Sequence, residues 1–153
     1  MYKKLSLLLG AALLVTGCSI QQSVEPSSVS SGNELCIVEN AAVREGFIAE
    51  LKSSLNTNGV RYKILPENSP ITACEWTATY IARWSWDVTI YMSYAEIKVF
   101  RNGALDGSAL YDSTRGGANM SKFIDAETKI RELVDQLLQK TALIRNFENS
   151  NSV

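Results

Sequence analysis

Histidine is absent from the 153 residues of this chain, and its absence excludes several kinds of chemistry. Without an imidazole there is no Ser-His-Asp or Cys-His nucleophile system and no histidine metal site. Cysteine is scarce, with three residues and no Cys-x-x-Cys spacing. Lysine and arginine form no cluster, and the formal net charge is −1. The composition therefore argues against nucleic acid as a partner, and it predicts no cofactor and no metal site.

A long apolar run is also missing, because no stretch reaches the roughly 20 residues that a membrane-spanning helix needs. The longest run, Leu5–Leu14, follows Lys3 and Lys4 and ends in small residues before Cys18. A basic start, an apolar run of about ten residues and a small-residue ending are typical of a secretory signal peptide. We therefore predict that residues 1–17 form a signal peptide.

The end of this segment, Leu14-Val15-Thr16-Gly17-Cys18, resembles the lipobox of bacterial lipoproteins. The resemblance implies cleavage before Cys18, a diacylglycerol on its sulfur and usually a further acyl chain on the new amino terminus. Two or more acyl chains hold a protein firmly on a bilayer. The next residue is Ser19, which in this family is compatible with the periplasmic face of the outer membrane. Anchoring outside the single membrane of a Gram-positive host is the alternative.

The sequence after the lipobox suggests three further parts. Residues 18–33 are predicted to be the lipidated cysteine and a flexible tether, because they are rich in serine and glutamine and poor in apolar residues. A single α+β domain is expected over 34–142, and a disordered tail over 143–153.

The two cysteines that remain after Cys18 is assigned to lipid are Cys36 and Cys74. An even pair in an oxidising compartment predicts a disulfide. It would close a loop of about 39 residues and stabilise the fold by roughly 4 kcal/mol. A reactive or metal-bound thiol pair is the alternative, which the lack of histidine disfavours.

The first half of the predicted domain has the pattern of a βαβ unit. Leu35–Glu39 is a short β-branched run, apolar residues recur at helical spacing from Val43 to Leu55, and Val60–Leu65 alternates. Asn40 is expected to cap the helix, and Asn58-Gly59 to end it. The two strands should be parallel.

The second half predicts a meander and a helix. Trp76–Asp87 alternates with period two, Val88–Phe100 ends at the hairpin signal Asn102-Gly103, and a short strand follows over Ser108–Thr114. A final helix is expected over Ser121–Lys140, with Ser121 as its cap. The sum is a two-layer α+β fold: a mixed five-stranded sheet with two helices, one on the crossover and one C-terminal, on one face.

Three stretches resemble a family of short, uncharacterised proteobacterial envelope lipoproteins: Trp84–Asp87, Tyr94–Phe100 and Leu110–Leu133. This family brings no known activity. The order of elements also resembles the amino-terminal domain of the Tol-system propeller protein and lipoprotein activators of penicillin-binding proteins. Such an analogy of element order implies little about function.

Two short segments are candidates for a contact surface. One is the predicted bend Ser85-Trp86-Asp87, where an exposed indole would suggest a partner. The other, Arg115-Gly116-Gly117-Ala118-Asn119, precedes a helix, where backbone amides can hold an anion, although its glycines also suit turn geometry. The candidate contact surface comprises Trp86, Asp87, Arg115, Gly116, Gly117 and Asn119.

The leading hypothesis is a non-catalytic, lipid-anchored envelope lipoprotein that docks a protein or cell-wall partner near the membrane. One alternative is a small-ligand or glycan-binding module on the aromatic strand, which predicts a concave pocket with Trp86 or Tyr91 exposed. Another is a cell-wall hydrolase, which requires two carboxylates in one cleft. The acids available for this are Asp87, Glu96 and Asp112.

Overall fold

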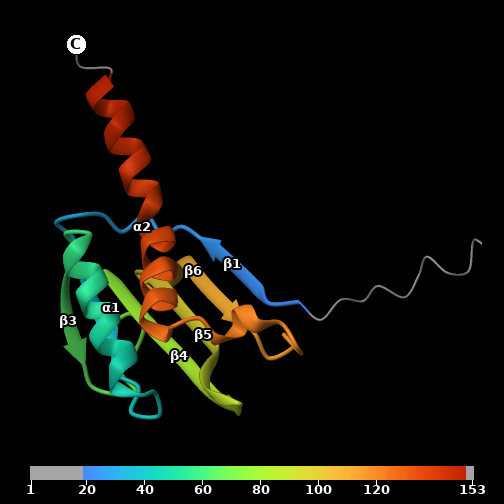
Figure 1. The fold of residues 1–153 in the computed structure, drawn as a ribbon. Coiled ribbons are helices and arrows are strands. Elements are labelled where there is room, and N and C mark those ends of the chain that lie inside the picture. Colours follow the sequence, from blue (N-terminus) through green and yellow to red (C-terminus); the bar gives the residue numbers. More distant parts are fainter. Residues whose placement is uncertain (1–18, 151–153) are drawn as a thin grey trace, which may run out of the picture.

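The computed structural model describes the backbone of residues 19–150 and the side chains of residues 19–138. The described residues form an α+β domain with one mixed six-stranded sheet and two α-helices (Figure 1). In chain order the elements are β1 (Gln21–Glu25), β2 (Glu34–Val38), α1 (Glu45–Thr57), β3 (Arg61–Leu65), β4 (Trp76–Asp87), β5 (Thr89–Arg101), β6 (Ala104–Asp112), the 3-10 helix η1 (Met120–Phe123) and α2 (Ala126–Ser150). The strand order across the sheet is β1-β6-β5-β4-β2-β3.

The predicted βαβ unit is confirmed, because β2 and β3 pair in parallel on either side of α1 in sequence. Gly59 follows α1 with a φ of 71°, the left-handed conformation expected of a residue that ends a helix. The prediction that Asn40 caps α1 is wrong. Its side chain instead accepts a hydrogen bond from the Ala42 amide and donates one to the Tyr80 carbonyl, so it fixes the turn before the helix to β4.

The predicted meander is also confirmed, with β4, β5 and β6 antiparallel to one another. The bounds of β4 agree with the predicted strand over Trp76–Asp87. β6 begins at Ala104, four residues earlier than predicted, because the Asn102-Gly103 turn returns the chain directly into the sheet. Both turn residues have positive φ, as a tight hairpin requires.

A sixth strand, β1, corrects the prediction of a flexible tether over residues 19–33 and of a five-stranded sheet. β1 pairs antiparallel with β6 along its whole length, from Gln21 opposite Asp112 to Glu25 opposite Ser108. Its polar side chains hold it to α2: the Gln22 amide donates to Glu132 at 2.8 Å and accepts from Lys129 at 2.9 Å. Backbone pairing and these hydrogen bonds hold β1 in place. β1 therefore lacks the alternating apolar residues by which a strand is usually recognised in a sequence.

Residues 26–33, which we call the strap, cross from β1 to β2 and complete the core. Val29 is fully buried, and the Ser27 amide donates to the carbonyl of Leu137 in α2 at 2.8 Å. The Asp106 carboxylate accepts hydrogen bonds from both the Ser27 and the Ser28 hydroxyls. The strap is therefore part of the domain.

Both helices pack on one face of the sheet, as predicted (Figure 1). The bounds of the last helix differ from the prediction. α2 starts at Ala126, after a separate 3-10 turn, and Asp125 rather than Ser121 caps it by accepting from the Thr128 amide at 2.9 Å. α2 continues to Ser150, whereas the predicted helix ends at Lys140. The side chains beyond residue 138 lie outside the described residues, and a disordered tail over 143–153 stays a prediction.

The predicted disulfide is present between Cys36 and Cys74, with their Cα atoms 6.2 Å apart. It joins the middle of β2 to the residue two places before β4, and these two strands are neighbours, as expected. None of the helices in the described part of the chain is long and apolar enough to cross a membrane. Residues 1–18, with the predicted signal peptide and Cys18, lie outside the described residues.

The sheet has two different ends. The β4–β5 end carries the turn between Asp87 and Thr89, the start of β1 and the η1 loop. The β5–β6 end carries the Asn102-Gly103 turn, the strap and the disulfide. In Figure 1 the start of β1, the orange η1 region and the yellow-green hairpin tip lie at one end, and α2 runs away from it.

Candidate functional site

The β4–β5 hairpin extends past the rest of the sheet. β6 pairs with β5 only as far as Tyr94, and β2 pairs with β4 only at Thr77 and Ala78. A register shift between Arg83 and Trp84 precedes the free part of the hairpin. Residues 84–92 are therefore a two-stranded ribbon, a structure that is marginally stable without further support.

One side of this ribbon is supported by Lys122, a lysine that is only 5% exposed. Its ammonium group donates to the Asp87 carboxylate at 2.5 Å and to the Gly117 carbonyl at 2.6 Å. It also lies 5.5 Å from the ring centre of Tyr91 and 5.1 Å from that of Phe123. Lys122 thus ties the tip of the hairpin to the η1 loop by charge, hydrogen bonds and cation–π contact.

Lys122 also brings together the two predicted halves of the contact surface. Asp87 and Gly117, which are far apart in sequence, bind the same ammonium group. The Gly116 and Asn119 amides donate to carbonyls within their own loop, so these two amides serve the turn rather than an anion cradle. Arg115 is exposed beside them. The role of Lys122 could not be predicted from the sequence, because a lysine next to a serine in a polar loop gives no signal of burial.

The tip of the hairpin is apolar and exposed. Trp86 is 75% exposed, and Val88 at the turn is 85% exposed. Ile90, which pairs with Trp86 across the hairpin, is exposed too. Met120 of η1, on the loop that Lys122 joins to the hairpin, is 74% exposed. We call these four residues the apolar tip.

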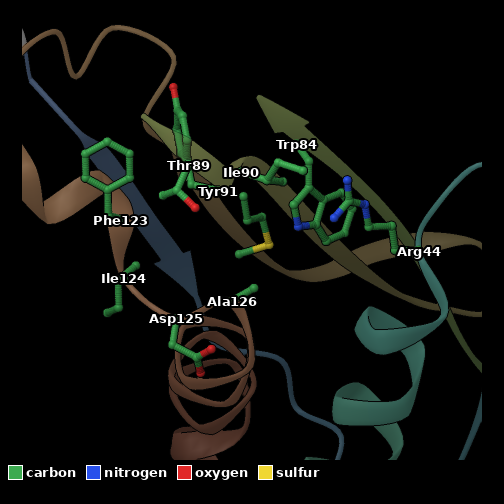
Figure 2. Close-up of a pocket in the computed structure, with 10 residues that line it drawn as sticks. Arg44, Trp84, Thr89, Ile90, Tyr91, Phe123, Ile124, Asp125 and Ala126 are labelled. Carbon is green, nitrogen blue, oxygen red and sulfur yellow. The ribbon is translucent and has the colours of Figure 1, made fainter. Parts of the chain in front are cut away.

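A cleft of about 460 Å³ lies beside the apolar tip. Figure 2 shows Trp84 and Arg44 at one side of it and Phe123, Ile124 and Asp125 at the other. The Arg44 guanidinium lies 4.9 Å from the Trp84 ring centre, and the Tyr91 and Phe123 rings meet edge to face at 5.3 Å. Its lining residues are Arg44, Trp84, Thr89, Ile90, Tyr91, Met92, Phe123, Ile124, Asp125 and Ala126.

Trp76 and Tyr80, which share a face of β4 with Trp84, lie in the core beneath the helices, and Trp84 is half-buried at the edge of the cleft. Tyr80 stacks on Phe47 of α1 at 5.3 Å. Burial raises the pKa of the Tyr80 hydroxyl. Tyr80 does not line the cleft. The aromatic strand is therefore mainly core, and only its last part borders the candidate site.

The three acids considered for hydrolysis are all engaged. Asp87 binds Lys122, as described. Burial acts to raise the pKa of Glu96, but hydrogen bonds from Lys98 and Tyr94 outweigh it and lower the pKa. Hydrogen bonds from Thr114 lower the pKa of Asp112. A glycosidase needs one carboxyl group with a raised pKa as its general acid, and neither Glu96 nor Asp112 has this property.

Three solved structures are similar to this chain, and the first of them has a TM-score above 0.5. A dodecamer of a PelC point variant from Paraburkholderia phytofirmans matches with a TM-score of 0.51 and 12% sequence identity, over 78% of this chain and 94% of that chain. A second PelC dodecamer structure from that organism has a TM-score of 0.45 and 12% identity, over 80% and 98% of the chains. A minor lipoprotein from Acinetobacter baumannii has a TM-score of 0.35 and 15% identity, over 73% and 94%.

At these identities, the first likeness shows a shared fold and nothing finer. No protein-family model matches the sequence, and no curated protein matches it either. The chain therefore shares its α+β architecture with a protein that assembles as a dodecamer, and its own role has to be argued from its residues.

Proposed function

We propose that this protein is a non-catalytic lipoprotein of the cell envelope, anchored by acyl chains on Cys18 at the periplasmic face of the outer membrane. Its domain docks a protein or cell-wall partner beside that membrane. Localisation and docking, rather than a chemical step, are its mechanism.

The short distance between Cys18 and the folded domain is the observation that carries this proposal. Only Ser19 and Ile20 separate the predicted acylated cysteine from the first residue of β1. Three residues of extended chain span about 10 Å, so the acyl chains would hold the domain directly against the bilayer. A flexible tether would have let the domain reach outward, whereas this arrangement restricts its partners to those near the membrane.

The cleft beside the apolar tip is the surface that we propose for docking. It is lined by aromatic, aliphatic and charged side chains from three parts of the chain, a mixture that suits an extended peptide or a saccharide. Its walls are held by Lys122 and by the Arg44–Trp84 contact, so little ordering is needed when a partner binds.

A photo-crosslinking amino acid at Arg44 tests the docking site in cells. Arg44 is exposed at the edge of the cleft, so we expect one defined product from this position. The matched control is the same amino acid at Leu105, which is exposed at the β5–β6 end and should give no such product. Equal labelling from both positions, or cleavage of peptidoglycan by the purified protein, would contradict the proposal.

A Cys18→Ala variant tests the anchor. It should appear in the soluble fraction and lack acyl groups in its intact mass, because Cys18 is the residue proposed to carry the acyl chains that hold the protein firmly on the membrane. Unchanged recovery with membranes would show that the anchor assignment is wrong.

Glycan binding in the cleft is a second candidate, because it predicted a concave site with Trp86 or Tyr91 accessible. Trp86 is exposed, and Tyr91 lines the cleft. Chemical-shift perturbation with peptidoglycan fragments distinguishes the two candidates. Shifts confined to the cleft residues would support the glycan, and an absence of shifts together with a protein crosslink from Arg44 would exclude it.

A second copy of this chain is a further candidate partner, because the structural neighbour is a dodecamer and the sheet has two edge strands, β1 and β3. Ile64 on β3 is partly exposed at that edge. Light scattering of the acylated protein in detergent would give a mass of several copies if these edges assemble, and the mass of one copy if they do not.

A further inference from the structure

The apolar tip lies at the end of the sheet from which the acyl chains would emerge. Gln21, at the start of β1, pairs with Asp112, and Asp112 in turn pairs with Tyr94, where the free part of the hairpin begins. Ile20 packs beside Gly116 in the loop that leads to Met120. The start of β1, which follows the predicted anchor at Cys18, therefore lies at the same end of the sheet as Trp86, Val88, Ile90 and Met120.

The distribution of exposed apolar side chains is uneven over the described residues. The three most exposed large hydrophobic residues are Val88, Trp86 and Met120, and all belong to the apolar tip. The exposed hydrophobic residues elsewhere are single: Ile64 on an edge strand, Ile81 on the uncovered face of the sheet and Leu105 at the β5–β6 end. Single exposed residues are ordinary, but several residues of this exposure at one end of the sheet favour a contact with another apolar phase.

Val88 provides a second, independent observation. It has a φ of 61°, a left-handed conformation that a β-branched residue adopts only with strain. Glycine or asparagine would serve this turn better, and the chain has them at Asn102-Gly103. A strained and almost fully exposed valine gives the isolated domain no benefit, which indicates that its side chain has a use outside the domain.

From these observations we infer that the apolar tip inserts into the lipid bilayer that carries Cys18, and so fixes the orientation of the domain on the membrane. This inference rests on the proposed acylation of Cys18. The tryptophan would lie at the boundary between headgroups and acyl chains, roughly 5–10 Å deep, where indole rings are favoured. The nearby exposed Arg115 is placed to meet lipid phosphates.

The orientation has a consequence for the rest of the molecule. α2 begins beside the apolar tip and runs away from it (Figure 1). A helix of 25 residues is about 37 Å long, so α2 would stand away from the bilayer. The cleft would open just above the lipid surface, where a membrane-associated partner can reach it.

Fluorescence quenching by brominated lipid tests the inference on the acylated, full mature chain. The protein is reconstituted into phosphatidylcholine vesicles whose acyl chains are brominated either near the headgroup or near the bilayer centre. We expect quenching of the tryptophan emission, stronger from the shallow bromines than from the deep ones. The Trp86→Phe variant should lose this quenching, because Trp76 is in the core and Trp84 is half-buried against Arg44.

A matched control places the indole at the other end of the sheet. In the Trp86→Phe background, Leu105→Trp adds a tryptophan at another exposed position, roughly 30 Å along the hairpins from position 86. This variant should show no quenching from either bromine depth. Quenching at Leu105→Trp equal to that at Trp86 would overturn the inference, because it would show that the domain has no fixed orientation.

Flotation of the same vesicles separates this inference from the proposed function. If the protein floats with the vesicles and carries acyl groups but Trp86 is not quenched, the anchor stands and membrane insertion of the tip is wrong. A crosslink from position 88 to protein in place of lipid would overturn it in the same way. If the protein carries no acyl group and does not float, the anchor itself fails.

Discussion

The two hairpin turns at the ends of β5 solve the same geometric problem with different residues. At the β5–β6 end, Asn102 and Gly103 both have positive φ, a conformation that asparagine and glycine adopt readily. The Asn102 amide also donates to the Glu75 carbonyl at 2.8 Å. At the β4–β5 end, a valine adopts positive φ and projects into solvent. The first turn is built for the stability of the fold. The second departs from good turn chemistry at the end of the sheet that carries the start of β1.

The means of support differ in the same way. The β5–β6 end is covalently joined through Cys36–Cys74 and crossed by the strap. The β4–β5 end depends on one buried lysine, and its ribbon has no sheet neighbours beyond Tyr94 among the described residues. One end is therefore fixed by a covalent bond and by the strap, while the other depends on the contacts of a single side chain.

Loss of the disulfide should have the largest effect on stability. The Cys36→Ala, Cys74→Ala double variant should lose about 4 kcal/mol of unfolding free energy. The reason is that the unfolded chain is no longer closed into a loop between two cysteines 38 positions apart. Urea unfolding of wild type and variant under oxidising conditions measures this. A loss of less than about 1 kcal/mol would show that the strap alone supports this end.

The strap can be tested through Gly107, which lies against it in β6. A Cβ atom at this position would lie 2.6 Å from the Ser27 amide nitrogen and 2.7 Å from the Ser27 Cα. Gly107→Ala should therefore displace the strap and cost about 2 kcal/mol in urea unfolding. Gly46→Ala is the matched control, because a Cβ there meets nothing within 4 Å in α1 and should raise stability slightly.

Lys122→Met should weaken the β4–β5 end alone. The variant keeps the apolar stem but loses the hydrogen bonds to Asp87 and Gly117, and we expect a cost of about 1–2 kcal/mol. Hydrogen exchange should accelerate at Tyr91 and Met92 and stay unchanged at Arg101. Lys98→Met is the control, since its exposed ion pair with Glu96 should contribute less than about 1 kcal/mol. Faster exchange at both ends would contradict the independence of the two ends.

Much of this architecture could be predicted from the sequence, because β2, α1, β4 and β5 have the apolar periods of their structures. The disulfide could be predicted from the parity of the cysteines. β1 could not, because Val24 is its only apolar residue and its partners on α2 are more than a hundred positions away. Composition describes what a segment can bury by itself, and it gives no information on hydrogen bonds with a distant helix.

The candidate site could be predicted only in part, because local sequence patterns do not show long-range contacts. The sequence places Trp86 at a predicted bend, and it indicates each segment of the candidate contact surface separately. Their meeting through Lys122 depends on a long-range contact that no local pattern encodes. The burial of Lys122 and the strain at Val88 are visible only in three dimensions.

Substitutions at the two positive-φ turn positions test the contrast between the two ends. Val88→Gly should relieve the left-handed strain and raise the unfolding free energy by about 1 kcal/mol, while it reduces the depth of the tip in vesicles. Gly103→Ala should lower stability by about 1 kcal/mol, because it forces a side chain into a φ of 83° and against Thr72. Thermal or urea unfolding of each variant measures these changes in stability. A loss of stability in Val88→Gly would mean that the valine packs within the domain after all.

The smallest expected difference between the two ends is in how much unfolding free energy each loses at low pH. Burial acts to raise the pKa of Asp106, but hydrogen bonds from Ser27 and Ser28 hold it below its usual value. A carboxyl group with a lowered pKa in the folded state stabilises the protein above its unfolded pKa of about 3.9 and loses this contribution as the pH falls through the folded value. Wild type should therefore lose stability below about pH 5, and Asp106→Asn should lose less over the same range.

Asp112 at the β4–β5 end is the comparison for that titration. Its pKa is also lowered, by hydrogen bonds from Thr114, only two residues away. Such a local contact survives partly in the unfolded chain, so less of the pKa difference is available to stabilise the fold. Asp106 instead binds serines that are 78 and 79 positions away, and these contacts vanish on unfolding. Asp112→Asn should therefore leave the acid dependence of urea unfolding close to that of wild type, and an equal effect of both variants would show that the strap gives the β5–β6 end no special acid sensitivity.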